Sequence, residues 1–221
     1  MRQEIKIEKK ASEVIQPRSV EEAQEAIRTR QDLSGADLRG MALKSISAVS
    51  AVLRETDLTK ADLSYGLLIN PNFYKASLHD AAAHNTIILG GDLVKTSLIQ
   101  ADLSHSAIIG TDASESDFEG ANLRSAALVG TNFTNANFIQ ANLTNARLAG
   151  LDVTGADFTD TDLTGTRAYN VNWEKAKIQP PSLPGPLIQL SAWTWSVILG
   201  GFLGVFALLI YSRTRKKRKP L

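Results

Sequence analysis

Three histidines are the residues of this chain best suited to chemistry, because imidazole binds metals and exchanges protons near neutral pH. They are His79, His84 and His105, and the adjacent Asp80 and Asn85 supply oxygen atoms that can act as further ligands. Their spacing matches no standard zinc motif. The sequence contains no cysteine, which excludes thiolate metal sites and disulfides. We therefore predict that the chain binds no metal and no cofactor.

Motifs for catalysis are also missing from the sequence. No glycine-rich phosphate loop follows a strand pattern, and no nucleophile lies beside a base in a known arrangement. Residues 31–180 contain 17 acidic and 11 basic residues, which are dispersed along the segment. The chain is therefore predicted to be neither an enzyme nor a protein that binds a small-molecule substrate.

The dominant feature of the sequence is an apolar residue at every fifth position. Thirty apolar positions follow one another at five-residue intervals from Leu33 to Ile178, without an insertion. A helix repeats near 3.6 residues and a strand at 2, so neither element explains this period. A mostly small residue lies two positions before each apolar residue, and Asp or Asn is common between them. We expect two inward-facing residues in every five, with Asp or Asn bonding the backbone at corners.

Segments such as ADLSY, ADLSH, ANLRS and ANLTN make this pattern similar to that of the pentapeptide-repeat family, whose repeat is A(D/N)LXX. The resemblance covers about two-thirds of the chain, residues 31–180. It implies an all-β solenoid, a right-handed quadrilateral β-helix in which four repeats make one coil. Thirty repeats then make about seven and a half coils, with an interior filled by large apolar side chains and no cleft.

A second period of twenty residues supports a four-sided coil. Phe118, Phe138 and Phe158 share one core position of successive coils and are predicted to stack. One corner position is occupied in successive coils by Ser50, Asn70, Gly90, Gly110, Gly130, Gly150 and Asn170. Glycine and asparagine tolerate positive φ, so this corner is predicted to adopt a left-handed backbone throughout.

One side of the coil is predicted to be apolar on its outer surface, whereas the other three sides are polar or mixed. The candidate partner-binding residues on this side are Val49, Leu67, Ile69, Ile87, Leu89, Ile109, Val129, Arg147, Arg167 and Tyr169. Such a strip exceeds what solitary soluble proteins normally expose. We interpret it as a docking surface for a protein partner or a second copy of the chain. The alternatives are a tolerated apolar exterior and a cover formed by the N-terminal segment.

The N-terminal segment, residues 1–30, is predicted to contain a short capping helix. Ser19 and Glu22 form an S-x-x-E capping box, and Val20, Ala23 and Ile27 fall on one helical face. The first coil of a β-helix has unpaired strands that invite aggregation. We expect the helix over residues 19–30 to cover them.

The C-terminal part is predicted to hold a linker and a membrane span. Four prolines in residues 179–190 exclude regular sheet or helix, and we assign a linker to residues 181–190. The 19 uncharged residues from Trp193 to Tyr211 carry aromatic residues at both ends. As a helix they extend about 28 Å, close to the thickness of a bilayer core. We therefore predict a transmembrane α-helix over residues 191–212.

Two further features of this region point to membrane contacts. Small residues recur at four-residue spacing within the span and predict helix–helix packing: Ala192, Ser196, Gly200 and Gly204. The tail, residues 213–221, carries six cations that can contact anionic lipid: Arg213, Arg215, Lys216, Lys217, Arg218 and Lys219. The positive-inside rule places this tail in the cytoplasm and the rod outside. A rod with short-range contacts and no export signal folds before the span emerges, so we prefer a tail anchor with the rod in the cytoplasm.

The sequence therefore predicts a single-pass, membrane-anchored scaffold or assembly factor that contacts membrane lipid and a protein partner. The family is abundant in cyanobacteria, and the resemblance implies a thylakoid or plasma membrane. Some family members mimic duplex DNA and modulate topoisomerases, which is one alternative. Lys75, Lys95, Arg124 and Arg147 interrupt the mildly acidic rod, so no nucleic-acid role is predicted. A purely structural rod is the other alternative.

Overall fold

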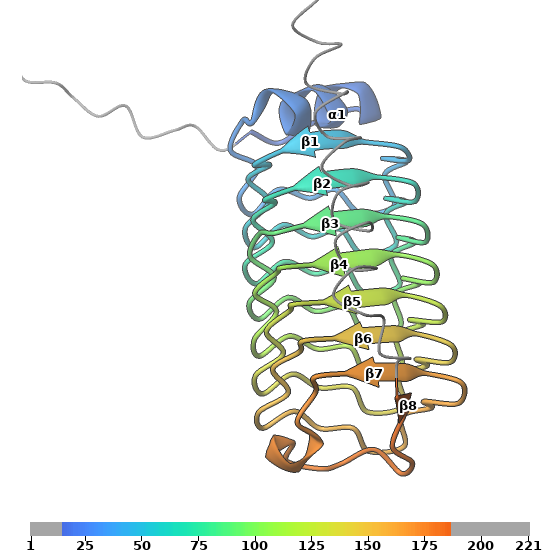
Figure 1. Cartoon of the computed structure of the whole chain (residues 1–221). Helices are drawn as coiled ribbons and strands as arrows, with labels where there is room; N and C mark the ends of the chain where they lie inside the picture. Colours follow the sequence, from blue (N-terminus) through green and yellow to red (C-terminus); the bar gives the residue numbers. More distant parts are fainter. Residues whose placement is uncertain (1–14, 187–221) are drawn as a thin grey trace, which may run out of the picture. The chain divides into compact units, whose positions relative to one another are not determined.

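The computed structural model describes residues 15–186 of the chain, which form a parallel β-solenoid of about seven turns with one helix at its N-terminal end (Figure 1). The helix is α1 (Val20–Thr29), and the solenoid ends in a 3₁₀ helix, η1 (Trp173–Lys175). Seven strands of three residues follow one another at intervals of twenty residues: β1 (Ser47–Val49), β2 (Leu67–Ile69), β3 (Ile87–Leu89), β4 (Ala107–Ile109), β5 (Ala127–Val129), β6 (Arg147–Ala149) and β7 (Arg167–Tyr169).

Each turn of the solenoid has four paired segments. Strands β1 to β7 pair in parallel with a register of twenty residues, as in Ala48 opposite Leu68. On the other three sides, single bridges with the same separation join successive turns, as in Asp37 with Asp57. The predicted all-β, four-sided coil is therefore confirmed.

The corners of the coil have a left-handed backbone at every fifth residue from Arg30 to Asn170. The one corner column that the sequence predicted is confirmed, from Ser50 at φ 55° to Asn170 at φ 51°. Residues such as Lys60 and Tyr65 adopt positive φ at the other corners. Sequence reasoning missed these corners because positive φ is uncommon outside glycine and asparagine. Hydrogen bonds to the adjacent turns hold them there, as from the Lys60 N–H to the His79 carbonyl at 2.9 Å.

The core is one continuous apolar column inside the coil. The predicted central positions are buried from Leu33 to Leu163. Phe138 lies between Phe118 and Phe158, with ring centroids 4.9 Å apart and planes within 3° on each side. The predicted phenylalanine stack is confirmed, and Phe133 packs edge-on against its middle ring at 5.1 Å.

Helix α1 covers the N-terminal end of the core. The Ser19 hydroxyl accepts a hydrogen bond from the Glu22 N–H at 3.2 Å, as expected for the capping box. The Glu22 carboxylate accepts its bond from the Arg18 N–H at 2.8 Å, one residue earlier than the motif predicts. Ala23, Ala26 and Ile27 are buried against the first turn, so the predicted capping role is confirmed. Val20, predicted for the same face, is only half-buried.

The C-terminal end differs from the predicted register. Ile178 pairs with Asp157, a separation of 21 residues, because η1 adds one residue to the final turn. Ile178 is therefore 42% exposed and is not a core residue. The Trp173 ring meets Phe158 edge-on at 5.2 Å and closes the column. The solenoid thus has about seven turns and not the seven and a half that thirty uninterrupted repeats imply.

The proline-rich segment also departs from its prediction. Gly185–Pro186 form a two-residue strand, β8, the last in the strand order of the sheet. Proline is compatible with the end of a sheet, where its missing N–H is not needed. None of the helices in residues 15–186 combines the length and hydropathy that a bilayer crossing needs. The predicted span over 191–212 and the basic tail lie outside the described residues.

Gly91 is a position where the coil is expected to tolerate no side chain. Its φ is +95°, and a Cβ atom there would lie 2.4 Å from the carbonyl oxygen of Pro71. We expect Gly91→Ala to destabilise the rod by roughly 1–3 kcal/mol, measured by urea denaturation. Gly130→Ala is the matched control, since its φ is +60° and its Cβ would meet nothing within 4 Å. Equal stability of the two variants would contradict this explanation.

Candidate docking surface

The outward-facing side chains of β1 to β7 form one continuous surface, which we call the apolar strip. The middle residue of each strand points into the core, and the two flanking residues point outward. The register places Val49, Ile69, Leu89, Ile109, Val129, Ala149 and Tyr169 in one column. It places Ser47, Leu67, Ile87, Ala107, Ala127, Arg147 and Arg167 in the other. The ten candidate residues predicted from the sequence therefore lie on one side of the coil.

Side chains in the strip shield one another, because neighbouring strands are only about 4.8 Å apart. Ile87 is 37% exposed and Tyr169 is 46% exposed. Leu67, Ile69 and the other large aliphatic residues of the strip are half-buried. The surface is thus a nearly flat, close-packed layer of aliphatic groups.

The local sequence explains why this side alone carries three-residue strands. On the other three sides, the residue before the central position is often Asp or Asn, and its side chain accepts the N–H two residues later. Asp62 accepts from Ser64 at 2.9 Å and Asn142 from Thr144 at 2.9 Å in this way. On the strand side the same position holds Leu67 or Ile87, which cannot form this turn. Large aliphatic residues favour the extended, pleated backbone seen there.

The turns in which an aspartate side chain accepts the N–H two residues later also make the rod sensitive to acid. The Thr154 hydroxyl lowers the pKa of Asp152, and the Thr164 hydroxyl lowers the pKa of Asp162, each helped by the backbone N–H of that threonine. Hydrogen bonds from Thr159 likewise lower the pKa of Asp157, against the opposing effect of its burial. A carboxylate whose pKa is lower in the folded state stabilises the fold above its unfolded pKa. This contribution is lost as the pH falls through the folded pKa.

We expect the rod to lose stability as the pH falls below the ordinary aspartate value of 3.8. The triple variant Asp152→Asn, Asp157→Asn, Asp162→Asn should show a flatter dependence of its unfolding midpoint on pH. The amide oxygens can accept the same bonds, as those of Asn132, Asn137 and Asn142 do one turn earlier. Urea midpoints measured between neutral pH and about pH 2 test this, and identical slopes for both proteins would contradict it.

Two of the three histidines, His79 and His84, make polar side-chain contacts with neighbouring residues. The Nδ1 atom of His84 lies 3.0 Å from the Ser64 hydroxyl and 3.7 Å from the Asp102 carboxylate. Both contacts use the same ring nitrogen, and Ser64 is buried with 0% exposure, so the three residues do not form a nucleophilic relay. The twenty-residue spacing of Ser64 and His84 is the sequence signal that could have predicted this pair. No group of three His, Cys, Asp or Glu side chains within residues 15–186 is placed to hold a metal.

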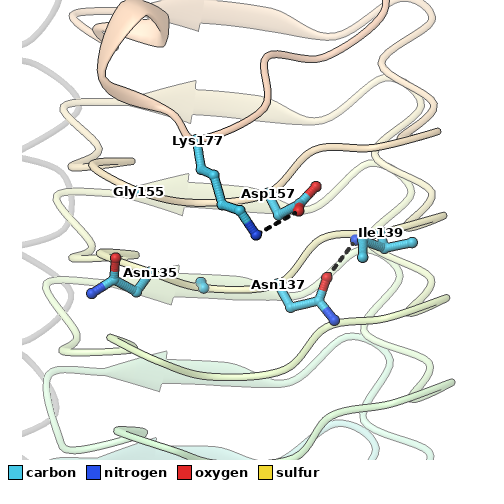
Figure 2. Close-up of a pocket in the computed structure, with 7 residues that line it drawn as sticks. Asn135, Asn137, Ile139, Gly155, Asp157 and Lys177 are labelled. Carbon is cyan, nitrogen blue, oxygen red and sulfur yellow. Dashed lines mark hydrogen bonds and ion pairs between the residues drawn. The ribbon is translucent and has the colours of Figure 1, made fainter.

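A depression of about 410 Å³ lies near the C-terminal end of the solenoid (Figure 2). The Lys177 ammonium group lies 3.6 Å from the Asp157 carboxylate at its rim. Asn137 accepts a hydrogen bond from the Ile139 N–H at 2.9 Å, which is the corner bond of its own turn. These groups support the coil, and the apolar strip remains the stronger candidate for a functional surface.

Comparison with known proteins gives the following similarities. The family model for pentapeptide repeats matches eight copies, over residues 32–68, 101–140 and 136–172. A solved structure of QnrB1, a plasmid-mediated fluoroquinolone resistance protein, is 25% identical over 66% of this chain and 76% of its own, with a TM-score of 0.48. HetL of the cyanobacterium Nostoc, involved in heterocyst differentiation regulation, is 23% identical over 70% and 85%, with a TM-score of 0.34.

A pentapeptide repeat protein of the Arabidopsis thaliana thylakoid lumen is 30% identical over 63% of this chain and 72% of its own, with a TM-score of 0.30. No curated protein matches the chain.

Proposed function

This chain belongs to the pentapeptide-repeat family, and from that premise we propose that it is a membrane-anchored scaffold or assembly protein that docks a protein partner through the apolar strip. The observation that carries the proposal is the strip itself, in which aliphatic side chains of successive turns stack on one side of the rod. Repeat proteins commonly bind partners through one such extended surface. The role requires no catalysis, and we propose that the protein is not an enzyme.

The alternative cover, the N-terminal segment, is not supported by its described part. The Ile15 N–H donates to the Asp32 carbonyl at 3.2 Å, and the Gln16 side chain bonds Gly35 and Asp37. These contacts lie on another side of the first turn, away from β1. Helix α1 contacts β1 but none of the strands β2 to β7, so the greater part of the strip is left accessible to a partner.

The anchoring part of the proposal rests on the sequence of residues 191–221. The uncharged stretch from Trp193 to Tyr211 has the length of a membrane span. We propose a single-pass protein with its rod in the cytoplasm, at a thylakoid or plasma membrane if the source is a cyanobacterium. Protease added to sealed right-side-out vesicles should leave the rod intact, and its digestion there would overturn this orientation.

DNA mimicry is not proposed for this chain. The two charged residues of the strip, Arg147 and Arg167, are both basic, and Lys95 pairs with Glu115 at 3.4 Å on another side. A purely structural rod is retained as one outcome of the experiment below.

Site-specific photo-cross-linking in native membranes tests the docking role. A photoreactive residue is placed at Leu89 in the strip, or at Ile99, which is the equivalent outward position of another side. We expect Leu89 to cross-link one recurrent protein, identified by mass spectrometry, and Ile99 to give no such adduct. Equal adducts at the two positions, or none at Leu89, would favour the purely structural rod.

A further inference from the structure

The apolar strip carries charge at one end only. Arg147 and Arg167 are the only charged residues of β1 to β7, and they are direct register partners on adjacent strands. Both side chains are exposed. Neither takes part in an ion pair within residues 15–186. Like charges on neighbouring strands repel each other, so this end of the strip favours a negatively charged partner.

The shape of the strip suits a single α-helix. Six steps of about 4.8 Å from β1 to β7 make it about 29 Å long, and three-residue strands make it about 10 Å wide. A helix of about twenty residues is about 30 Å long and about 10 Å in diameter. Because the strands are so short, a helix can bury its apolar face only by lying along the rod axis, across the strands.

A second copy of the chain fits the strip poorly. Its own strip offers no carboxylate to the arginines, and the corner residues beside the strands, such as Asn70 and Gly110, are neutral. The chain's own C-terminal segment is no better complement, because it has no charged residue between Lys177 and Arg213 and a basic tail after it.

We propose that the strip binds one amphipathic α-helix of another protein, with the acidic C-terminal end of that helix beside Arg147 and Arg167. The inference rests on the proposed docking function and specifies its partner. The helix dipole places partial negative charge at the same end and adds to the attraction. Apolar residues of the helix at i, i+3, i+4 and i+7 contact Ile69, Leu89 and Ile109.

Two synthetic peptides of identical composition test the proposed helix polarity. Both are twenty-residue amphipathic helices with a Leu-rich face, and the first carries two glutamates in its last turn whereas the second carries them in its first turn. Binding to the full-length protein in neutral detergent micelles is measured by fluorescence anisotropy. We expect the first peptide to bind about threefold more tightly, since the second can place its glutamates beside the two arginines only in the reverse direction, which reverses its helix dipole.

The rod variant Arg147→Glu/Arg167→Glu should abolish or reverse this preference. The same two peptides are measured against the original and the variant rod. Any difference in helicity between the free peptides therefore cancels when the two preferences are compared. Arg54→Glu/Arg124→Glu, which makes the same charge change at exposed residues on other sides, should retain the preference.

Equal affinity for the two peptides, or a preference insensitive to Arg147 and Arg167, would overturn the proposed helix. Binding of phosphatidylglycerol vesicles that depends on these arginines and excludes both peptides would overturn it in favour of a lipid surface. A cross-link from Leu89 in native membranes combined with either result would retain the docking function and reject only the helical partner. Absence of that cross-link would reject the docking function itself.

Discussion

Phe138→Asp is expected to unfold the rod. Phe138 is 1% exposed and lies between two stacked rings, each 4.9 Å away, with Phe133 edge-on at 5.1 Å. An aspartate there would place a carboxylate in the centre of the core, where the coil offers it no cation. Burying an unpaired charge costs several kcal/mol, comparable with the whole stability of a typical domain. Loss of the β-sheet signal in far-UV circular dichroism, and rapid digestion by protease, should report the unfolding.

Phe138→Leu is the matched control for this variant. Leucine occupies the same core column in earlier turns, at Leu58, Leu78 and Leu98, so the coil accepts its shape. We expect this change to cost roughly 1–2 kcal/mol, mainly from lost ring contacts and a small cavity. A folded Phe138→Asp protein with native protease resistance would contradict the filled core.

The second large effect is expected on partner binding. The triple variant Ile69→Ser, Leu89→Ser, Ile109→Ser removes the centre of the apolar strip, while the core residues behind it are unchanged. Each lost aliphatic contact is expected to weaken helix binding by about 1 kcal/mol or more. Together they should lower the affinity for the first synthetic peptide about a hundredfold. Circular dichroism should remain native.

Val94→Ser, Ile99→Ser, Ile139→Ser is the corresponding control for partner binding. These three residues are also half-buried and follow a central core residue, but they lie on the other sides of the coil. Peptide affinity should be unchanged in this control. Equal losses in the two triple variants would mean that the strip is not the binding surface.

The repeat made the interior of this fold largely predictable. The five-residue period identifies the central residues from Leu33 to Leu163, and the twenty-residue period identifies the phenylalanine stack. Both periods reflect side chains that must fill a coil of constant width. The strip followed from the same counting, because the register that stacks Phe118 on Phe138 also stacks Leu89 on Ile109.

Features that depend on single hydrogen bonds were less predictable. The inserted residue before Ile178 follows from η1, in which Asn172 accepts the Glu174 N–H at 3.1 Å. Asn172 also continues the Asp/Asn pattern, so the period alone did not mark the end of the repeat. Positive φ at Lys60 or Tyr65 comes from bonding between turns, which residue preference does not report. The twenty-residue spacing could have predicted that Ser64 and His84 are neighbours, but it does not report their hydrogen bond.

The four-sided turn also limits how this gene can change in length. Removing twenty residues deletes one complete turn of the solenoid. The side chains of the remaining turns stay aligned, so the strip only becomes shorter. Removing five residues also preserves the repeat, but it rotates everything downstream by a quarter turn about the rod axis. If the five residues are removed between them, Leu89 and Ile109 face different directions, although the core remains filled. Natural length variants that retain binding should therefore differ by complete turns of twenty residues.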